Sequence, residues 1–309
     1  MKKKLALVAL LVVLLLAVAY FLFPEFLFNL AQQANRRCAG LVKKEVQVDS
    51  DRIVYLEGGR GEIVLLLHGY TANKDRWTHF AKRLTPDYHV IIPDLAGFGE
   101  STKRWDQSYD IDSQVKLLDR FTEVLQLQRF HLAGNSMGGA VAAVYSAEIP
   151  QKILTVALLA PYGVVTAKKS EFQLQRDKGV NPLLIRNPAD FERVLPYLFF
   201  KPPPIPAVFR KVIAAQAMAA REFNEKIAQD LAKERLALEP FLPMIEAPVL
   251  IIWGDHDRML DVSGASILEK GLKNHQTLIM NDTGHLPMME KPAETAAAYI
   301  SFLKNERSM

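Results

Sequence analysis

Short, nearly all-apolar runs recur along the chain, at residues 63–67, 90–92, 130–133, 153–159, 249–252 and 277–280. Uninterrupted apolar runs of this length are typical of strands that are buried on both faces of a parallel sheet. Helical patterns lie between most of these runs, at residues 112–127, 137–148, 264–272 and 293–303. The alternation predicts an α/β fold, in which helices cover both faces of a mostly parallel sheet.

An antiparallel hairpin is expected ahead of these strands. Residues 46–48 and 53–55 carry apolar side chains at alternate positions, on either side of the turn-forming Asp49-Ser50-Asp51. Alternation of this kind around a turn is the pattern of two paired strands. The hairpin would be the first part of the α/β core along the chain.

The interval 162–246 interrupts the alternation, because it contains helical stretches and prolines but no convincing strand pattern. We predict that it forms a helical cap over the sheet, inserted between two parts of the core, 43–161 and 247–309. Its apolar side chains suit ordinary helix packing and, as a group, also the wall of an acyl-chain pocket. They include Phe191, Leu195, Tyr197, Leu198, Phe199, Phe200 and Phe209.

The amino terminus has the pattern of a membrane anchor. Residues 5–23 contain no charged residue, and Lys2, Lys3 and Lys4 precede them. A helix of this length spans about 28 Å, close to the thickness of a hydrocarbon core. The alternative is a cleaved signal peptide, but its apolar stretch usually has about 7 to 15 residues and ends at a small-x-small site. We therefore predict an uncleaved, single-pass transmembrane helix within residues 1–24.

The lysines predict the orientation of that anchor. By the positive-inside rule the amino terminus stays in the cytoplasm and the rest of the chain crosses the membrane, which in a bacterium means an inner-membrane protein with a periplasmic domain. Residues 25–42 follow as an amphipathic helix, with Phe26, Leu27, Leu30 and Ala34 at helical spacing. This helix either packs on the domain or lies among the lipid head groups.

Composition narrows the classes of function. Half of the 309 residues are apolar, which is enough for a large buried core and excludes a disordered or fibrous protein. Without the three amino-terminal lysines the chain has 35 basic and 34 acidic residues, so nucleic acid is not an expected partner. The single cysteine, Cys38, excludes an internal disulfide and a multi-cysteine zinc site.

One motif carries the candidate nucleophile. Gly134-Asn135-Ser136-Met137-Gly138 follows a predicted strand and opens a predicted helix, which is the context that Gly-x-Ser-x-Gly requires. Gly134 and Gly138 remove side chains that would collide in such a sharp turn. Ser136 is therefore the candidate nucleophile, exposed at the carboxyl edge of the sheet.

A serine hydroxyl needs a base and an orienting carboxylate. His285, in the loop after the last apolar run, is the candidate base, whereas His131 lies within a strand and points away from the turn. Asp255, Asp257 and Asp261 all follow the 249–253 run, and the order serine, aspartate, histidine is the one this context predicts. Asp257 is our choice for the acid, with Asp255 in reserve.

Acyl transfer also requires donors for an oxyanion. The backbone amide of Met137, directly after the nucleophile, is one candidate, and that of Tyr70 is the other. His68 and Gly69 would shape the loop that presents Tyr70, which follows the 63–67 strand. The 94–101 segment after the next strand is more consistent with a structural turn.

With these residues in place, residues 43–306 resemble the α/β-hydrolase fold enzymes. The segments 68–77, 112–116 and 252–265 are most similar to the membrane-anchored monoacylglycerol lipase branch and the related bacterial lipases. With the lysine-flanked anchor, the chain is also similar to the membrane-bound phospholipases A of Pseudomonas. In that branch the carboxylate matching Asp257 is the acid, whereas Asn135 departs from the His, Gln or Tyr often found beside the nucleophile.

The resemblance implies a serine hydrolase that releases fatty acids from phospholipids, lysophospholipids or monoacylglycerols of the bilayer. It includes phospholipase A activity of the sn-1 type and association into a homodimer. No metal or organic cofactor is expected. Two alternatives are an esterase of small soluble esters and a ligand receptor that keeps the fold without appreciable turnover.

Overall fold

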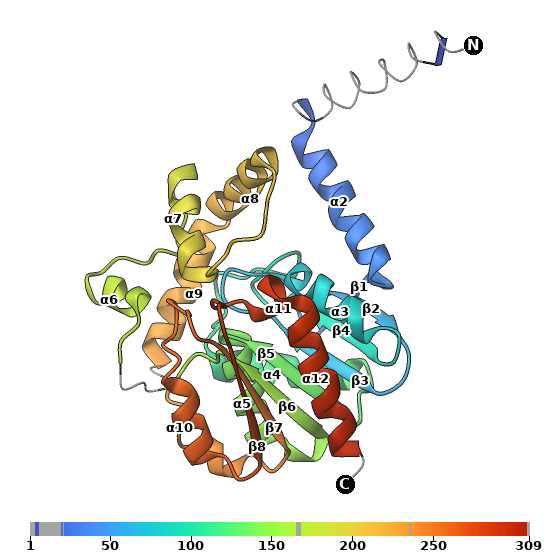
Figure 1. The fold of residues 1–309 in the computed structure, drawn as a ribbon, viewed down its shortest axis with the longest axis vertical. Helices are drawn as coiled ribbons and strands as arrows, with labels where there is room; N and C mark the ends of the chain where they lie inside the picture. Colours follow the sequence, from blue (N-terminus) through green and yellow to red (C-terminus); the bar gives the residue numbers. More distant parts are fainter. Residues whose placement is uncertain (1–3, 6–19, 21, 165–167, 235, 308–309) are drawn as a thin grey trace.

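The computed structural model describes residues 4, 5, 20 and 22–307, apart from 165–167 and 235. A sheet of eight strands lies at the centre, between two layers of helices (Figure 1). The strands are β1 (Leu41–Val48), β2 (Asp51–Gly59), β3 (Ile63–Leu67), β4 (His89–Pro93), β5 (Phe130–Asn135), β6 (Ile153–Leu159), β7 (Val249–Gly254) and β8 (His275–Met280).

The sheet has the order β1-β2-β4-β3-β5-β6-β7-β8, and β3 to β8 run parallel to one another. β2 pairs antiparallel with both β1 and β4. Val48 pairs with Asp51, so the predicted hairpin turns at two residues, Asp49 and Ser50. The prediction of a mostly parallel α/β sheet is confirmed.

Each central strand contributes to two cores because successive side chains point to opposite faces. In β7, Val249, Ile251 and Trp253 belong to one core cluster, whereas Leu250 and Ile252 belong to the other. Burial on both faces explains why the strands read as continuous apolar runs.

Helices cover both faces of the sheet. One face carries α4 (Ile111–Val124), α5 (Met137–Glu148) and α10 (Gly264–Gly271), and the other carries α3 (Thr78–Leu84) and α12 (Pro292–Arg307). Short turns of helix complete the fold, η1 (Lys74–Trp77), η2 (Pro150–Lys152), η3 (Leu242–Met244) and α11 (Pro287–Glu290). The sequence pattern did not predict α3, although Trp77 and Phe80 at its start are fully buried and meet edge to face.

Among the described residues between β6 and β7, four α-helices lie over one end of the sheet (Figure 1). They are α6 (Glu171–Asp177), α7 (Pro188–Leu198), α8 (Ala207–Ala219) and α9 (Arg221–Glu234). Capping boxes begin two of them, at Ser170 before α6 and at Asn187 before α7. We call residues 162–246 the cap segment.

The helix α2 (Pro24–Cys38) precedes β1 and ends four residues before the predicted boundary at residue 42. Gly40 adopts a φ of 67°, which breaks the helix, and β1 then begins at Leu41. The predicted anchor falls largely on residues 6–19 and 21, which lie outside the described residues. Among the helices that are described, none has the length and apolar character needed to cross a bilayer.

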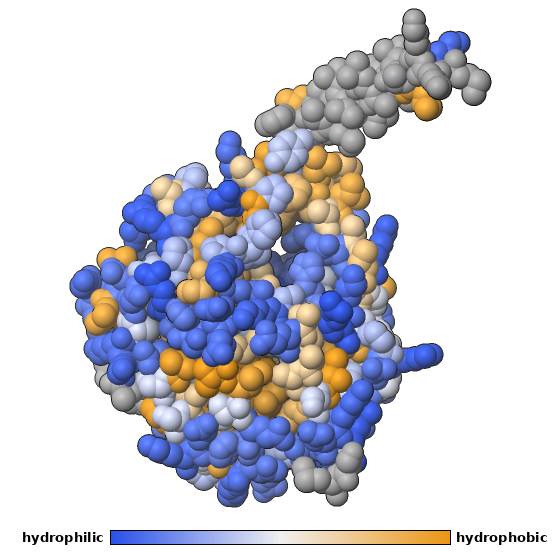
Figure 2. Space-filling model, viewed as in Figure 1, coloured by the Kyte–Doolittle hydropathy of each residue, from blue (hydrophilic) through white to orange (hydrophobic). Residues whose placement is uncertain are grey.

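The face of α2 that contacts the domain is not the apolar face expected from its sequence. Arg36 forms a two-pronged ion pair with Asp75 at 2.6 and 2.7 Å, and Phe28 packs edge to face on Phe209 of α8. Phe26 and Leu30, by contrast, are 66% and 49% exposed. Hydrophobic side chains therefore gather along α2 beside the amino-terminal residues (Figure 2).

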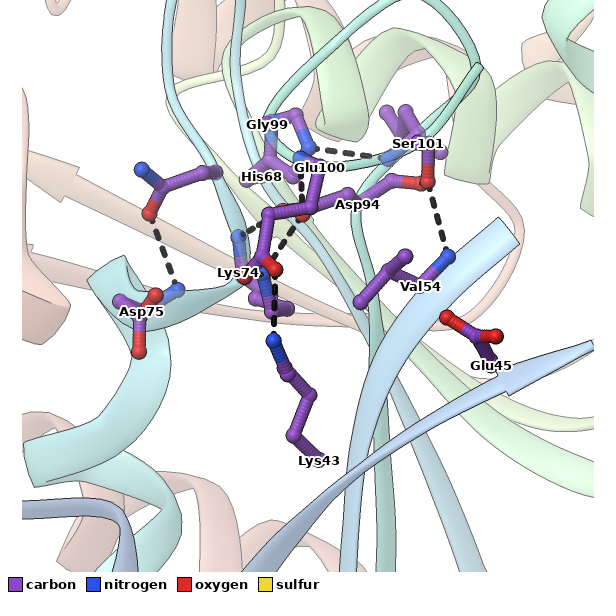
Figure 3. A network of polar contacts seen from close by, with 12 residues as sticks. Lys43, Glu45, Val54, His68, Lys74, Asp75, Asp94, Gly99, Glu100 and Ser101 are labelled. Atoms are coloured by element: carbon purple, nitrogen blue, oxygen red, sulfur yellow. Dashed lines mark hydrogen bonds and ion pairs between the residues drawn. The ribbon is translucent and has the colours of Figure 1, made fainter. Parts of the chain in front are cut away.

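A polar network joins β1 to the loops that follow β3 and β4 (Figure 3). Lys74 and Asp94 are both buried, and Lys74 Nζ lies 2.7 Å from Asp94 Oδ2 and 2.9 Å from Glu100 Oε1. Lys43 of β1 reaches the other oxygen of Glu100 at 2.7 Å. Partial burial raises the pKa of Glu100, but the hydrogen bonds from both lysines outweigh it and bring the pKa to about 2.

The two lysines provide a matched test of this network. Lys74→Met leaves Asp94 buried without its cation, so we expect the free energy of unfolding to fall by about 3 kcal/mol or more. Lys43→Met removes an exposed partner of the same Glu100 and is expected to cost less than about 1 kcal/mol. Urea denaturation of the detergent-solubilised protein measures both. Equal losses would contradict the role assigned to buried Asp94.

Candidate active site

Ser136 stands alone between the end of β5 and the start of α5. Its backbone has φ 56° and ψ −119°, a conformation that costs a non-glycine residue about 1 to 3 kcal/mol. Three backbone hydrogen bonds hold it there: Ser136 N donates to Leu159 O, and Ser136 O accepts from Ala140 N and Tyr162 N. The turn places the serine side chain on the wall of a cavity at the carboxyl edge of the sheet.

The two glycines of the motif are required by close approach. A Cβ atom on Gly134 would lie 2.1 Å from the oxygen of Gly138. A Cβ atom on Gly138 would lie 2.5 Å from the oxygens of Leu67 and His68. Both distances are far shorter than van der Waals contact, so the turn can pack against β3 only without these side chains.

His285 and Asp257 come together from the loops after β8 and β7. His285 Nδ1 lies 2.8 Å from Asp257 Oδ2, and both side chains are buried. Asp257 Oδ1 accepts from the backbone amides of Met259 and Leu260 at 2.8 and 2.9 Å. Because the carboxylate can only accept, Nδ1 of the imidazole is the donor, which leaves Nε2 as an acceptor. His285 and Ser136 line the same cavity.

The other two acidic candidates are engaged elsewhere. Asp255 Oδ1 lies 2.7 Å from His256 Nδ1 and accepts from the amide of Thr283. Burial raises the pKa of Asp255, but these hydrogen bonds outweigh it, so its pKa lies below the ordinary value. Asp261 accepts from the amide of Ser263. Of the three candidates that the sequence proposes, only Asp257 is within hydrogen-bonding distance of His285 in the described structure.

Met137 and Tyr70 line the same cavity as Ser136. Met137 is the first residue of α5, where backbone N–H groups have no acceptor within the helix. The Tyr70 hydroxyl donates to the backbone oxygen of Asn224 in α9 at 2.6 Å, and burial raises its pKa. This contact, which joins the loop after β3 to the cap segment, was not predicted from the sequence.

His68 and Gly69 hold the loop that carries Tyr70. His68 is fully buried, and its Nε2 accepts from the amide of Leu95 at 3.0 Å while Nδ1 donates to Gly69 O at 2.8 Å. Burial lowers the pKa of His68, which favours the neutral ring that this pair of bonds requires. A Cβ atom on Gly69 would lie 3.1 Å from that of Ser136, so the loop passes close to the nucleophile.

His131 does not take part in this cluster. It is buried in β5, with Nδ1 2.9 Å from Thr155 Oγ1 and Nε2 3.0 Å from Glu62 Oε2. Burial lowers its pKa more than Glu62 raises it. Its partners therefore lie in β6 and just before the amino end of β3, away from Ser136. This agrees with the rejection of His131 as the base.

Asn135 has a positioning role that the sequence did not indicate. Its Nδ2 donates to the backbone oxygens of Leu159 and His285 at 3.0 and 3.1 Å. The amide thus ties the end of β5 both to β6 and to the loop of the candidate base. Its partners are 24 and 150 residues away, so no local pattern could have revealed them.

Three cavities meet around this cluster. The nucleophile chamber, of about 60 Å³, is lined by Ser136, His285 and Arg76 among others. The apolar chamber, of about 230 Å³, shares Ser136, Tyr70 and Met259 with the nucleophile chamber. The α2 cavity, of about 390 Å³, lies between α2, the cap segment and the loop after β3, and shares Arg76 with the nucleophile chamber.

The apolar residues predicted for an acyl-chain wall are divided between the cavities and the core. Leu198 lines the nucleophile chamber and Phe191 lines the α2 cavity, whereas Leu195 and Phe199 are buried in the core. The apolar chamber is instead lined by Phe172, Leu183, Leu231, Ala232, Met259 and Leu260. Helical periodicity identifies apolar residues but does not distinguish those that face a cavity from those that face the core.

The arrangement suits nucleophilic catalysis. A hydroxyl, an imidazole and a buried carboxylate are the groups that covalent acyl transfer uses. In the part of the chain that the structure describes, no cluster of three His, Cys, Asp or Glu side chains is placed to hold a metal ion.

Comparison with known proteins agrees with this chemistry. A family model described as the alpha/beta hydrolase fold matches residues 62–189 and 214–292. Lipase 1 of Psychrobacter immobilis is 32% identical over 265 residues, covering 84% of this chain and 83% of that lipase. Monoacylglycerol lipase ABHD6 of Bos taurus is 30% identical, covering 96% of this chain and 92% of that enzyme. The crystal structure of a membrane phospholipase A, a bacterial virulence factor, has a TM-score of 0.92 and 42% identity, covering 100% of both chains.

A fluorophosphonate probe tests the cluster independently of any substrate. We expect it to label the protein at Ser136 and not to label Ser136→Ala. Asp257→Ala should retain less than about a tenth of the labelling rate, because the carboxylate orients the base. Asp255→Ala, the matched control, should stay within about threefold, since that side chain lies apart from the imidazole. If Asp255→Ala lost labelling and Asp257→Ala kept it, Asp255 would be the orienting acid instead of Asp257.

Proposed function

The chain belongs to the α/β-hydrolase fold family as a hydrolase of lipid carboxylic esters. From this premise we propose that it releases fatty acids from membrane lipids, with Ser136 as nucleophile, His285 as base and Asp257 as the orienting acid. Its substrates are phospholipids, cleaved as by a phospholipase A of the sn-1 type, lysophospholipids and monoacylglycerols. The observation that carries the proposal is the opening of an apolar chamber at Ser136.

The reaction proceeds in two halves. Ser136 Oγ attacks the ester carbonyl while His285 Nε2 takes its proton, and the backbone amides of Met137 and Tyr70 stabilise the oxyanion. His285 then protonates the leaving glycerol oxygen, which leaves an acyl group on Ser136. A water molecule, deprotonated by the same imidazole, releases the fatty acid and restores the serine. Asp257 stabilises the imidazolium in both halves.

The apolar chamber is the site proposed for the acyl chain. Its walls are mainly hydrophobic and come from the cap segment and the loop after β7, with Phe172, Leu231 and Leu260 among them. Burial of each methylene group contributes about 0.8 kcal/mol, so such a chamber favours long acyl chains. The alcohol part of the lipid then lies toward the α2 cavity, which shares Arg76 with the nucleophile chamber.

We place the catalytic domain against a membrane surface. Residues 1–24 are the proposed anchor in the inner membrane, with the lysines in the cytoplasm and the domain in the periplasm. The exposed Phe26 and Leu30 continue the apolar character of that segment along α2. The ion pair of Arg36 with Asp75 fixes α2 to the loop beside the nucleophile chamber, so the membrane and the active site are held close together.

Chain-length preference tests the lipid assignment. With the full-length protein in detergent micelles, we expect kcat/KM to rise at least about tenfold from p-nitrophenyl butyrate to the decanoate, because six more methylene groups enter the apolar chamber. Ser136→Ala should abolish both reactions. A preference for butyrate would indicate an esterase of small esters. Labelling of Ser136 without turnover of either ester would indicate a ligand receptor.

Deletion of residues 1–24 tests the role of the anchor. Hydrolysis of p-nitrophenyl butyrate should change less than about twofold, while hydrolysis of phospholipid in vesicles should fall about tenfold or more, because tethering raises the effective substrate concentration. Replacing both Phe26 and Leu30 with Asn should also lower the vesicle activity alone.

The matched control for the helix variant is Val124→Asn, which changes an apolar side chain of similar exposure at the end of α4. It should leave both activities unchanged. If the deletion lowers the two activities equally, residues 1–24 stabilise the domain and do not present it to lipid.

A further inference from the structure

Arg76 is a charged side chain on the wall of the candidate active site that the reaction described above does not use. It belongs to η1, in the loop between β3 and α3, and lines both the nucleophile chamber and the α2 cavity. Every other side chain on the wall of the nucleophile chamber is neutral apart from the titratable His285. A fixed positive charge therefore stands where the alcohol part of a substrate would leave Ser136.

The guanidinium of Arg76 has no hydrogen-bond or ion-pair partner among the described residues. Its neighbour Asp75 is the nearest carboxylate in sequence, but both oxygens of Asp75 accept from Arg36 at 2.6 and 2.7 Å. Burial lowers the pKa of Arg76, and the charge of Asp75 opposes this only in part. Arg76 is half-buried, and an unpaired charge that is partly withdrawn from water is costly, so its presence here favours an anionic ligand.

The surrounding charges do not compensate Arg76. The ionisable residues of the α2 cavity are the basic Arg36, Lys74, Arg76 and Lys103 and the acidic Asp75 and Glu100. Arg36 is paired with Asp75, and Lys74 is paired with Glu100 and with buried Asp94. Lys103 is exposed at the rim and donates to the backbone oxygen of Gly99. The excess positive charge that faces the interior of the cavity thus belongs to Arg76.

The geometry of the arginine side chain restricts the class of anionic ligand. A planar guanidinium presents paired N–H donors that match two oxygens of a phosphate. In a glycerophospholipid the phosphate lies only a few bonds from the ester oxygen, so a lipid with its carbonyl at Ser136 carries its phosphate into the adjoining space. The polar side of the α2 cavity, with Asn29 and Gln32 of α2, can accommodate the rest of a head group. A neutral monoacylglycerol has no group that needs this cation.

We propose that Arg76 binds the head-group phosphate of the substrate and so selects phospholipids and lysophospholipids over monoacylglycerols. The proposal rests on the lipid ester hydrolysis proposed above, and it makes Arg76 a specificity-determining residue of that site. The acyl chain occupies the apolar chamber, the ester lies at Ser136 and the phosphate lies at the junction with the α2 cavity.

Two substrates that differ only in the head group test this selection. For the full-length protein in detergent micelles we expect Arg76→Gln to lower kcat/KM for 1-palmitoyl-lysophosphatidylglycerol by about tenfold or more, because a charge-assisted pair is lost. Hydrolysis of 1-monopalmitoylglycerol should change less than about threefold, since no ion pair is involved. Arg76→Lys, which keeps the charge without the planar fork, should give an intermediate loss. Arg120→Gln, at an exposed arginine of α4, is the matched control and should alter neither substrate.

A second measurement needs no variant and therefore does not depend on folding of Arg76→Gln. Inhibition of p-nitrophenyl butyrate hydrolysis is compared for 1-O-hexadecylglycerol 3-phosphate and 1-O-hexadecylglycerol, which share the chain and lack an ester. We expect the phosphate to inhibit the wild-type protein at a concentration at least about tenfold lower. Equal inhibition, or an equal loss of kcat/KM on both palmitoyl lipids in Arg76→Gln, would overturn the proposal.

Two further outcomes distinguish a wrong phosphate assignment from a failure of the proposed lipid function. Hexadecanoate tests the product: if Arg76→Gln relieves inhibition by hexadecanoate and leaves inhibition by the phosphate unchanged, the cation binds a fatty-acid carboxylate and the phosphate assignment is wrong. If the wild-type protein hydrolyses neither palmitoyl lipid but does hydrolyse p-nitrophenyl butyrate, the proposed lipid function fails. The pair of ether inhibitors still decides the role of Arg76 in that case.

Discussion

The backbone of Ser136 is held in a left-handed conformation between a strand and a helix, and the neighbouring elements are arranged around that single residue. Such a conformation persists only where the surroundings over-determine it. Here Leu159 of β6 accepts from the amide of Ser136, Gly134 allows α5 to approach the end of β5, and Gly138 allows α5 to approach the end of β3. The parallel order of the strands then brings the loops after β3, β7 and β8 to the same edge, where Tyr70, Asp257 and His285 follow.

Polar contacts between distant segments hold this edge together. Asn135 ties the nucleophile strand to the loop of His285, and His68 ties the loop after β3 to the loop after β4. Lys74 and Asp94 form a buried ion pair beneath the same loops. A buried pair of this kind adds little net stability. Losing one partner is nevertheless strongly destabilising, because the other charge is then left uncompensated. The network therefore holds Lys74 of η1, the turn that also carries Arg76.

Much of the architecture follows from short-range patterns in the chain. The apolar runs predict β3 and β6 with their observed bounds, and the helical pattern after Ser136 predicts α5 to the residue. These predictions succeed because alternation, period and turn chemistry are local properties, set by the geometry of the backbone itself. The Gly-x-Ser-x-Gly segment likewise predicts Ser136 as the candidate nucleophile, since the neighbours of Ser136 in sequence are also its neighbours in the turn.

Other features depend on residues that are far apart in the sequence and close only in the folded chain. The position of three aspartates after the 249–253 run made each a candidate for the acid, with Asp257 preferred. Only the folded path of the loop after β7 brings Asp257, and not Asp255, within hydrogen-bonding distance of His285. The sequence pattern places Phe26 and Leu30 on one side of α2, but the contacts of Arg36 with Asp75 and of Phe28 with Phe209 lie on the side that meets the domain. No pattern indicated Arg76, because what distinguishes it is that its guanidinium, on the wall of two cavities, has no partner among the residues that the structure describes. Sequence alone determined which elements form, since that depends on local periodicity; tertiary structure decided which side chains meet, since pairing depends on distances that only the assembled fold sets.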